Sequence, residues 1–97
     1  MSSRTPTECI DLSTDTSANE IDRKDAIRAL QRANECDELA ELVRTSTLDD
    51  QYRRVALEAL ATPQCDSTLE ILADDDSLDH ERRDAAQTLL VDHDSDW

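Results

Sequence analysis

Glycine is absent from all 97 residues of the chain. Loops that wrap phosphate groups, and the tight turn that presents a nucleophilic serine, depend on glycine because the backbone must approach a ligand closely or adopt a positive φ angle. The sequence therefore offers neither kind of site. We predict no catalytic residue, no cofactor and no bound metal ion, and we expect a protein that is not an enzyme.

Large aromatic side chains are nearly absent as well, because the chain has no Phe, one Tyr and one Trp. Its core must therefore consist of many Leu, Ala and Ile contacts of modest size. Apolar residues are dense only between residues 20 and 91, which predicts a folded helical domain there. Residues 1–19 hold eight Ser or Thr and are expected to form a disordered or mobile tail, and residues 92–97 an acidic C-terminal tail. The apolar island Cys9–Leu12 within the first tail either docks on the domain or is solvated.

Lysine is scarce too, because Lys24 is the single lysine of the chain. The sequence also contains nine Arg and 24 acidic residues, which gives a net charge of −14. Such self-repulsion destabilises a compact state in dilute buffer, whereas at molar salt the Debye length falls to about 3 Å and screens it. This halophilic composition is typical of a salt-adapted cytosol. A second interpretation, that the acidity serves to bind a basic protein, stays open, although acidic residues in every segment favour solvation.

Long apolar runs are missing, and no segment has the composition of a signal peptide or a membrane span. Cys9, Cys36 and Cys65 are an odd number of thiols with no metal-ligand spacing. We therefore expect a cytoplasmic protein that contacts no membrane and keeps its thiols reduced.

The sequence does contain an internal repeat between Asp22 and Leu90, in which equivalent positions differ by 30 in residue number. They match in helices and linkers alike: Arg23, Arg53 and Arg83; Ala26, Ala56 and Ala86; Leu30, Leu60 and Leu90; Leu39 and Leu69; Leu42 and Leu72; Leu48 and Leu78; Asp49 and Asp79. A fixed period of this length is typical of a solenoid.

Apolar residues recur at intervals of three and four within each unit, which predicts amphipathic helices. We expect about five, near residues 20–33, 36–44, 50–62, 66–73 and 79–91, with Ile21 and Ile71 on buried faces. The array would hold two helical pairs and an unpaired fifth helix.

The segment Tyr52–Leu60, YRRVALEAL, resembles the first helix of a HEAT repeat of the short type found in phycobilin lyases. Leu39–Val43 and Leu69–Ala73 match its second helix, and Asp74–Asp76 its acidic turn. The resemblance implies an all-α fold, a right-handed α-α superhelix or HEAT-like mini-solenoid, that binds proteins on a curved face and carries no catalytic residues. Two departures concern the turns, since glycine is missing and Thr45–Thr47 replaces the acidic turn.

Basic residues open the first helix of each unit as the pairs Arg23 and Lys24, Arg53 and Arg54, and Arg82 and Arg83. Stacked units would align them either as an anion-binding groove or, as we favour, as a ladder of ion pairs with neighbouring Asp residues. Nucleic acid is not an expected partner because the net charge repels phosphates and no aromatics accompany the basic residues.

Three smaller features each have two interpretations. Cys36 and Cys65 open second helices, where a helix N-terminus lowers a thiol pKa and permits redox chemistry, but small buried residues closing a helix pair explain them as well. The alternation Asp92, Asp94, Asp96 is either a weak cation site or a solvated tail. Trp97 is either a frayed end or an anchor.

The fifth helix lacks a sixth helix to cover its apolar strip, which makes that strip the candidate interface of a homodimer. Its residues are Ala85, Ala86, Leu89, Leu90 and Val91. We expect a protein–protein interaction module or scaffold with an unknown protein partner. The alternatives are an accessory or lyase-like helper subunit of a cofactor-bearing enzyme, and an acidic mimic of nucleic acid.

Overall fold

The computed structural model describes residues 5–94, with side chains as far as Val91. This part of the chain is all-helical and contains no strand. Its elements are α1 (Pro6–Thr14), α2 (Glu20–Arg32), α3 (Cys36–Arg44), α4 (Asp50–Ala59), the short 3-10 helix η1 (Pro63–Cys65), α5 (Asp66–Ala73) and α6 (His80–Asp94). The five predicted helices are confirmed as α2 to α6, with bounds that differ by a few residues.

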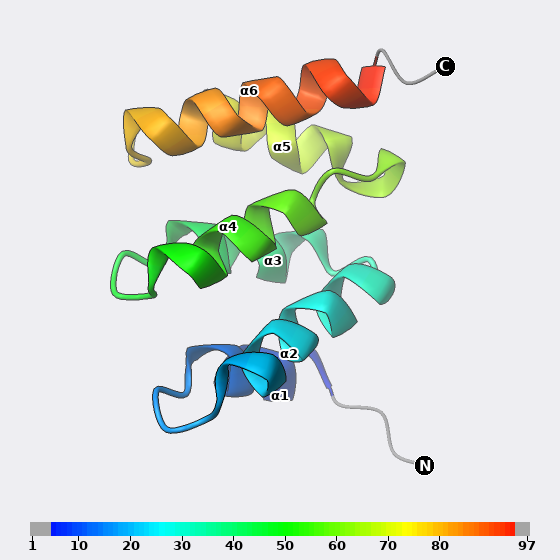
Figure 1. Cartoon of the computed structure of the whole chain (residues 1–97). Coiled ribbons are helices and arrows are strands. Elements are labelled where there is room, and N and C mark those ends of the chain that lie inside the picture. The colour runs from blue at the N-terminus through cyan, green and yellow to red at the C-terminus, as the bar shows by residue number, and fades with distance from the viewer. Residues whose placement is uncertain (1–4, 95–97) are drawn as a thin grey trace.

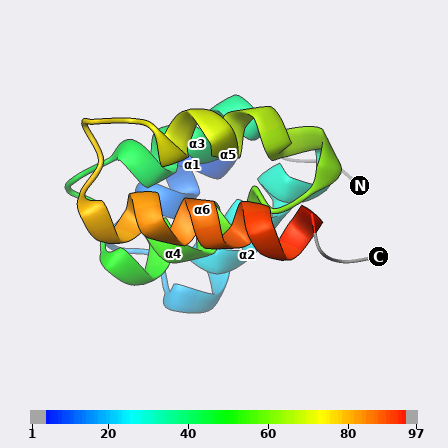
Figure 2. The same cartoon turned by 90° about the horizontal axis from the view of Figure 1, so that it is seen from above.

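The helices form two layers, with α1, α3 and α5 in one and α2, α4 and α6 in the other (Figures 1 and 2). Each helix of the first layer packs against the helix that follows it in the chain. Apolar side chains from both layers meet between them, and equivalent positions of the 30-residue repeat are buried together: Ala26, Ala56 and Ala86; Leu30 and Leu60; Leu39 and Leu69; Leu42 and Leu72; Leu48 and Leu78. The repeat therefore specifies the core.

Helix α1 corrects the prediction of five helices, because it occupies residues that we expected to form a mobile tail. Thr5 caps it through a capping box with Glu8, and Pro6 opens its first turn. Cys9 lies in the core at 3% exposure. The apolar segment Cys9–Leu12 therefore packs against the helical domain. The sequence already contained the capping residues of this helix.

The register of α1 also corrects the prediction of an unpaired last helix. Cys9 and Leu12 precede Leu39 and Leu42 by one full period, so the repeat begins earlier than we expected. The described chain holds three helical pairs in place of two pairs and a single helix, because α1 covers α2 and α5 covers α6.

The turn after α2 is closed without glycine. Asn34 takes the left-handed conformation at φ 58°. The amide of Glu35 donates to the carbonyl of Leu30 at 2.9 Å, and that of Asn34 to Gln31 at 3.0 Å, which is the Schellman pattern. Asparagine tolerates this conformation better than other residues with a Cβ, so the lack of glycine does not prevent a tight helix end.

A disulfide bond joins Cys36, the first residue of α3, to Cys65, just before α5. The expectation that all three thiols stay reduced is therefore wrong for this pair. The two residues sit 29 positions apart at nearly equivalent places of successive units, which brings their Cα atoms to 5.5 Å, within bonding reach. The bond ties neighbouring helices of the first layer together.

Helix α6 continues to Asp94, so its last turn includes part of the predicted acidic tail. Residues 95–97, with Trp97, lie outside the described residues, as do the side chains of Asp92 and Asp94. Both predictions for this end of the chain therefore stay predictions.

Candidate functional site

The outer side of the first layer has an open hollow that crosses all three of its helices. The hollow has a volume of about 600 Å³ and is lined by Ile10 of α1, by Asp37, Glu38, Ala40, Glu41 and Arg44 of α3, and by Thr68 and Ile71 of α5. A second hollow of about 710 Å³ adjoins it and is lined by Ser67, Glu70, Ile71 and Asp74–Asp76. We call these lining residues together the acidic face.

Ile71 borders both hollows, and its side chain is 59% exposed. The prediction that Ile71 belongs to the core is wrong, and so is that for Ile21, which is 71% exposed. The 30-residue register contained the signal for Ile71, because the equivalent positions are the exposed acids Asp11 and Glu41. An isoleucine at a position where the other units carry acids is a large apolar side chain left on the surface.

Charge is divided unequally between the two layers. Helices α1, α3 and α5 together carry seven acidic residues and one basic residue, Arg44. Helices α2, α4 and α6 carry nine acidic and eight basic residues. Acidic and basic residues are therefore nearly equal in number in the second layer, whereas acidic residues are in large excess in the first, because alternate helices fold to opposite sides.

Acidic groups crowd one another at the start of α3. A hydrogen bond with Glu38 raises the pKa of the Glu35 carboxyl, and burial and the charges of Glu38 and Asp37 raise it further. Removing a proton from this cluster is unfavourable because the new charge meets others of the same sign. This end of the acidic face thus favours a cation nearby.

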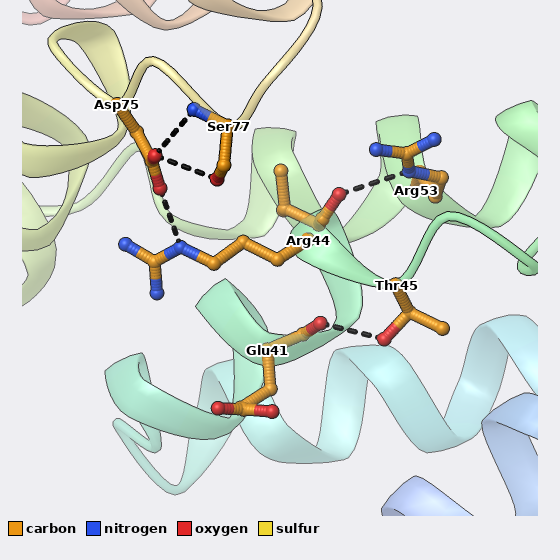
Figure 3. A network of polar contacts seen from close by, with 7 residues as sticks. Glu41, Arg44, Thr45, Arg53, Asp75 and Ser77 are labelled. Carbon is orange, nitrogen blue, oxygen red and sulfur yellow. Dashed lines mark hydrogen bonds and ion pairs between the residues drawn. The ribbon is translucent and has the colours of Figure 1, made fainter.

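Arg44 neutralises only one carboxylate of the acidic face, that of Asp75 (Figure 3). The Nε of Arg44 donates to the Oδ2 of Asp75 at 2.7 Å. The other oxygen of Asp75 accepts from the amide and hydroxyl of Ser77, at 2.9 and 2.7 Å. This contact links α3 to the turn after α5, and the same Asp–Ser turn occurs two units earlier at Asp15 and Ser17.

Asp75 predicts a pH dependence of stability. Hydrogen bonds from Ser77 and Arg44 lower the pKa of its carboxyl from 3.8 to about 2. A lowered folded-state pKa stabilises the fold fully above the unfolded-state pKa near 4, and this stabilisation is lost as the pH falls through about 2. We expect Asp75→Asn to unfold at lower urea concentration than the wild type at pH 7, with the difference shrinking between pH 4 and pH 2. Asp74→Asn removes the same charge without these contacts and should lack the loss at pH 7; equal curves for Asp75→Asn and the wild type at every pH would contradict the prediction.

Three basic residues of the second layer form ion pairs within the fold. Arg82 pairs with Asp79 at 2.8 Å and with Asp50, and Arg83 with Asp76 at 3.5 Å, so the predicted ion-pair ladder is confirmed for these two. Lys24 pairs with Glu20 on its own helix.

Arg23 and Arg53 have a role that sequence reasoning missed. The Nε of Arg23 donates to the carbonyl of Ser13, and that of Arg53 to Val43, both at 2.9 Å. Each acceptor lies at the C-terminal end of a first-layer helix, where carbonyls lack partners within the helix and a cation is favourable. Each arginine therefore caps the preceding helix, and the 30-residue spacing of donors and acceptors was the available signal.

The predicted interface strip on α6 is mostly covered. Ala86 is fully buried, while Ala85, Leu89 and Leu90 are partly buried against the core. Val91 alone of the five is well exposed, at 64%. The premise of an uncovered strip is wrong because α5 packs along α6; whether the chain dimerises through it stays a prediction.

Among residues 5–91, no group of three or more His, Cys, Asp and Glu is arranged to hold a metal ion. His80 contacts Asp84 one helical turn away, at 3.1 Å. No described helix is both long and apolar enough to cross a bilayer. No family model, no curated protein and no solved structure matches the chain.

Proposed function

We propose that the chain is a HEAT-like mini-solenoid, a right-handed α-α superhelix of three helical pairs, and that it acts as a protein–protein interaction module without catalytic activity. The constant 30-residue offset of helices, core positions and capping arginines supports the solenoid. Its acidic composition supports a salt-adapted, cytoplasmic setting.

The observation that carries the binding role is Ile71, exposed between two hollows on a face that spans three helices. A large apolar side chain on an otherwise polar surface gains free energy when a partner covers it. The face is built on helices, so the binding residues are held in place before the partner arrives.

The substitution Ile71→Glu tests this proposal. The tagged chain would be used at about molar KCl to capture partners from a lysate of the cells that produce it naturally. The captured proteins would be identified by mass spectrometry. We expect the partner recovered with the wild type to be lost with Ile71→Glu, because a charge placed in the contact cannot be desolvated cheaply. The substitution should leave the melting temperature within a few degrees of that of the wild type, because the side chain is exposed.

Ile21→Glu is the matched control, since Ile21 is at least as exposed as Ile71 but lies on α2 in the other layer. It should capture the same partner as the wild type. Equal capture by Ile71→Glu and the wild type would overturn the assignment of this face. Light scattering of the eluate tests the predicted homodimer at the same time.

A further inference from the structure

We infer that the ligand of the acidic face is a cationic amphipathic helix of another protein, with apolar residues on one side flanked by Lys or Arg. This inference rests on the proposed function and names the chemistry of its partner. Three observations carry it: an apolar floor formed by Ile10, Ala40 and Ile71, three glutamates near that floor without ion pairs, and a face that consists of helices and one turn and contains no strand.

The three apolar residues of the floor extend across the layer. Ile10, Ala40 and Ile71 come from three successive first-layer helices and line the same hollow. Apolar side chains spaced along one side of a helix fit such a floor, as in other complexes where an amphipathic helix occupies a groove. The partner therefore needs a continuous apolar side.

Three glutamates of the acidic face lack cationic partners among the described residues, whereas Asp75 pairs with Arg44 and Asp76 with Arg83. Glu38 and Glu41 line the first hollow and Glu70 the second, and none of the three forms an ion pair there. Arg44 is the one basic residue of α1, α3 and α5, and it is already paired with Asp75. A cationic partner would supply what the face lacks, whereas an acidic one would be repelled.

The face also restricts the backbone of the partner. Its helices use their own backbone groups internally, so there is no sheet edge among the described residues on which an extended peptide could form main-chain hydrogen bonds. A segment that lies against apolar side chains must satisfy its own backbone groups, because buried groups without hydrogen bonds are costly. A helix does this and an extended segment does not.

The experiment measures the affinity of the oxidised full chain for a synthetic helix of about 15 residues, the length at which isolated helices begin to form. The probe carries Leu on one side and Lys on the other; a second peptide replaces each Lys by Gln. Titrations are made at about 0.15 M and at about 1 M KCl, where the Debye lengths are about 8 and 3 Å.

Two triple variants of equal charge decide whether binding is local to the face. Glu38→Gln with Glu41→Gln and Glu70→Gln removes three carboxylates from the acidic face. Asp25→Asn with Glu58→Gln and Glu81→Gln removes three from α2, α4 and α6. We expect the first to weaken binding of the Lys peptide about tenfold at 0.15 M KCl, because exposed pairs contribute up to about fivefold each. The second should weaken it less than about twofold, and the Gln peptide should bind both variants and the wild type alike.

The possible failures are distinguishable. Equal weakening by the two triple variants means general attraction to a chain of charge −14 and overturns the inference. Loss of binding with Ile71→Ala, but none with the acidic-face triple variant, means that the face binds apolar helices without regard to charge; the inference then fails and the proposed function stands. If binding of the Lys peptide vanishes completely at 1 M KCl, the contact is purely electrostatic, as expected for an acidic protein that mimics nucleic acid. That result overturns the inference that the partner needs an apolar side.

Discussion

Reduction of the Cys36–Cys65 disulfide is expected to lower the free energy of unfolding by about 3–4 kcal/mol. The bond closes a loop with a sequence separation of 29 residues, and a cross-link of that span restricts the unfolded chain by about this amount. Single domains are stable by only about 5–15 kcal/mol in total, so the reduced protein should unfold at much lower urea concentration. The measurement is urea unfolding at about molar KCl, with and without a thiol reductant.

Variants assign this effect to the bond. Cys36→Ala combined with Cys65→Ala should unfold at the same urea concentration with and without reductant, while Cys9→Ala should respond as the wild type does. Labelling of the unfolded chain should find one thiol before reduction and three after it. A wild-type transition that ignores reductant would contradict the prediction.

The disulfide bears on the predicted location as well. Cytosolic thiols are kept reduced in most organisms, so a persistent bond and a cytoplasmic location oppose each other. Cytoplasmic location stays a prediction, and the redox state of Cys36 and Cys65 in freshly lysed cells would test it directly.

Replacing Arg23 by Ala is expected to destabilise the fold by about 2–4 kcal/mol. Arg23 is 6% exposed, donates to the carbonyl of Ser13 at 2.9 Å and lies 3.9 Å from the centre of the Tyr52 ring. Its removal leaves a buried carbonyl without this donor, which costs about 1–3 kcal/mol, and removes a cation–π contact of about 0.5–2 kcal/mol. The loss should appear in urea unfolding and as weaker amide-exchange protection of α1.

Arg83→Ala is the control at the equivalent position of the last unit. The Nε of Arg83 makes no hydrogen bond, and its ion pair with Asp76 is long and exposed. Surface pairs of this kind contribute about 0–1 kcal/mol, so the variant should lose less than about 1 kcal/mol. Equal destabilisation by the two substitutions would show that capping of α1 is not what Arg23 contributes.

Most of the helical layout was readable from the sequence by itself. Leucines and alanines at intervals of three and four, repeated with a 30-residue period, place α2 to α6 and most of the buried positions, because such a pattern leaves one stripe of each helix to bury. The sequence also held two signals that we did not use: the capping pair Thr5 and Glu8, and the extension of the repeat to Cys9 and Leu12.

The tertiary structure alone decided which groups meet. The Cys36–Cys65 bond, the contact of Arg44 with Asp75 and the capping of Ser13 by Arg23 each join residues of different helices or turns. Local patterns specify which side of a helix is buried, whereas the distance between two helices depends on how every side chain between them packs. For the same reason, the division of charge between the layers becomes visible only once alternate helices lie on opposite sides of the core.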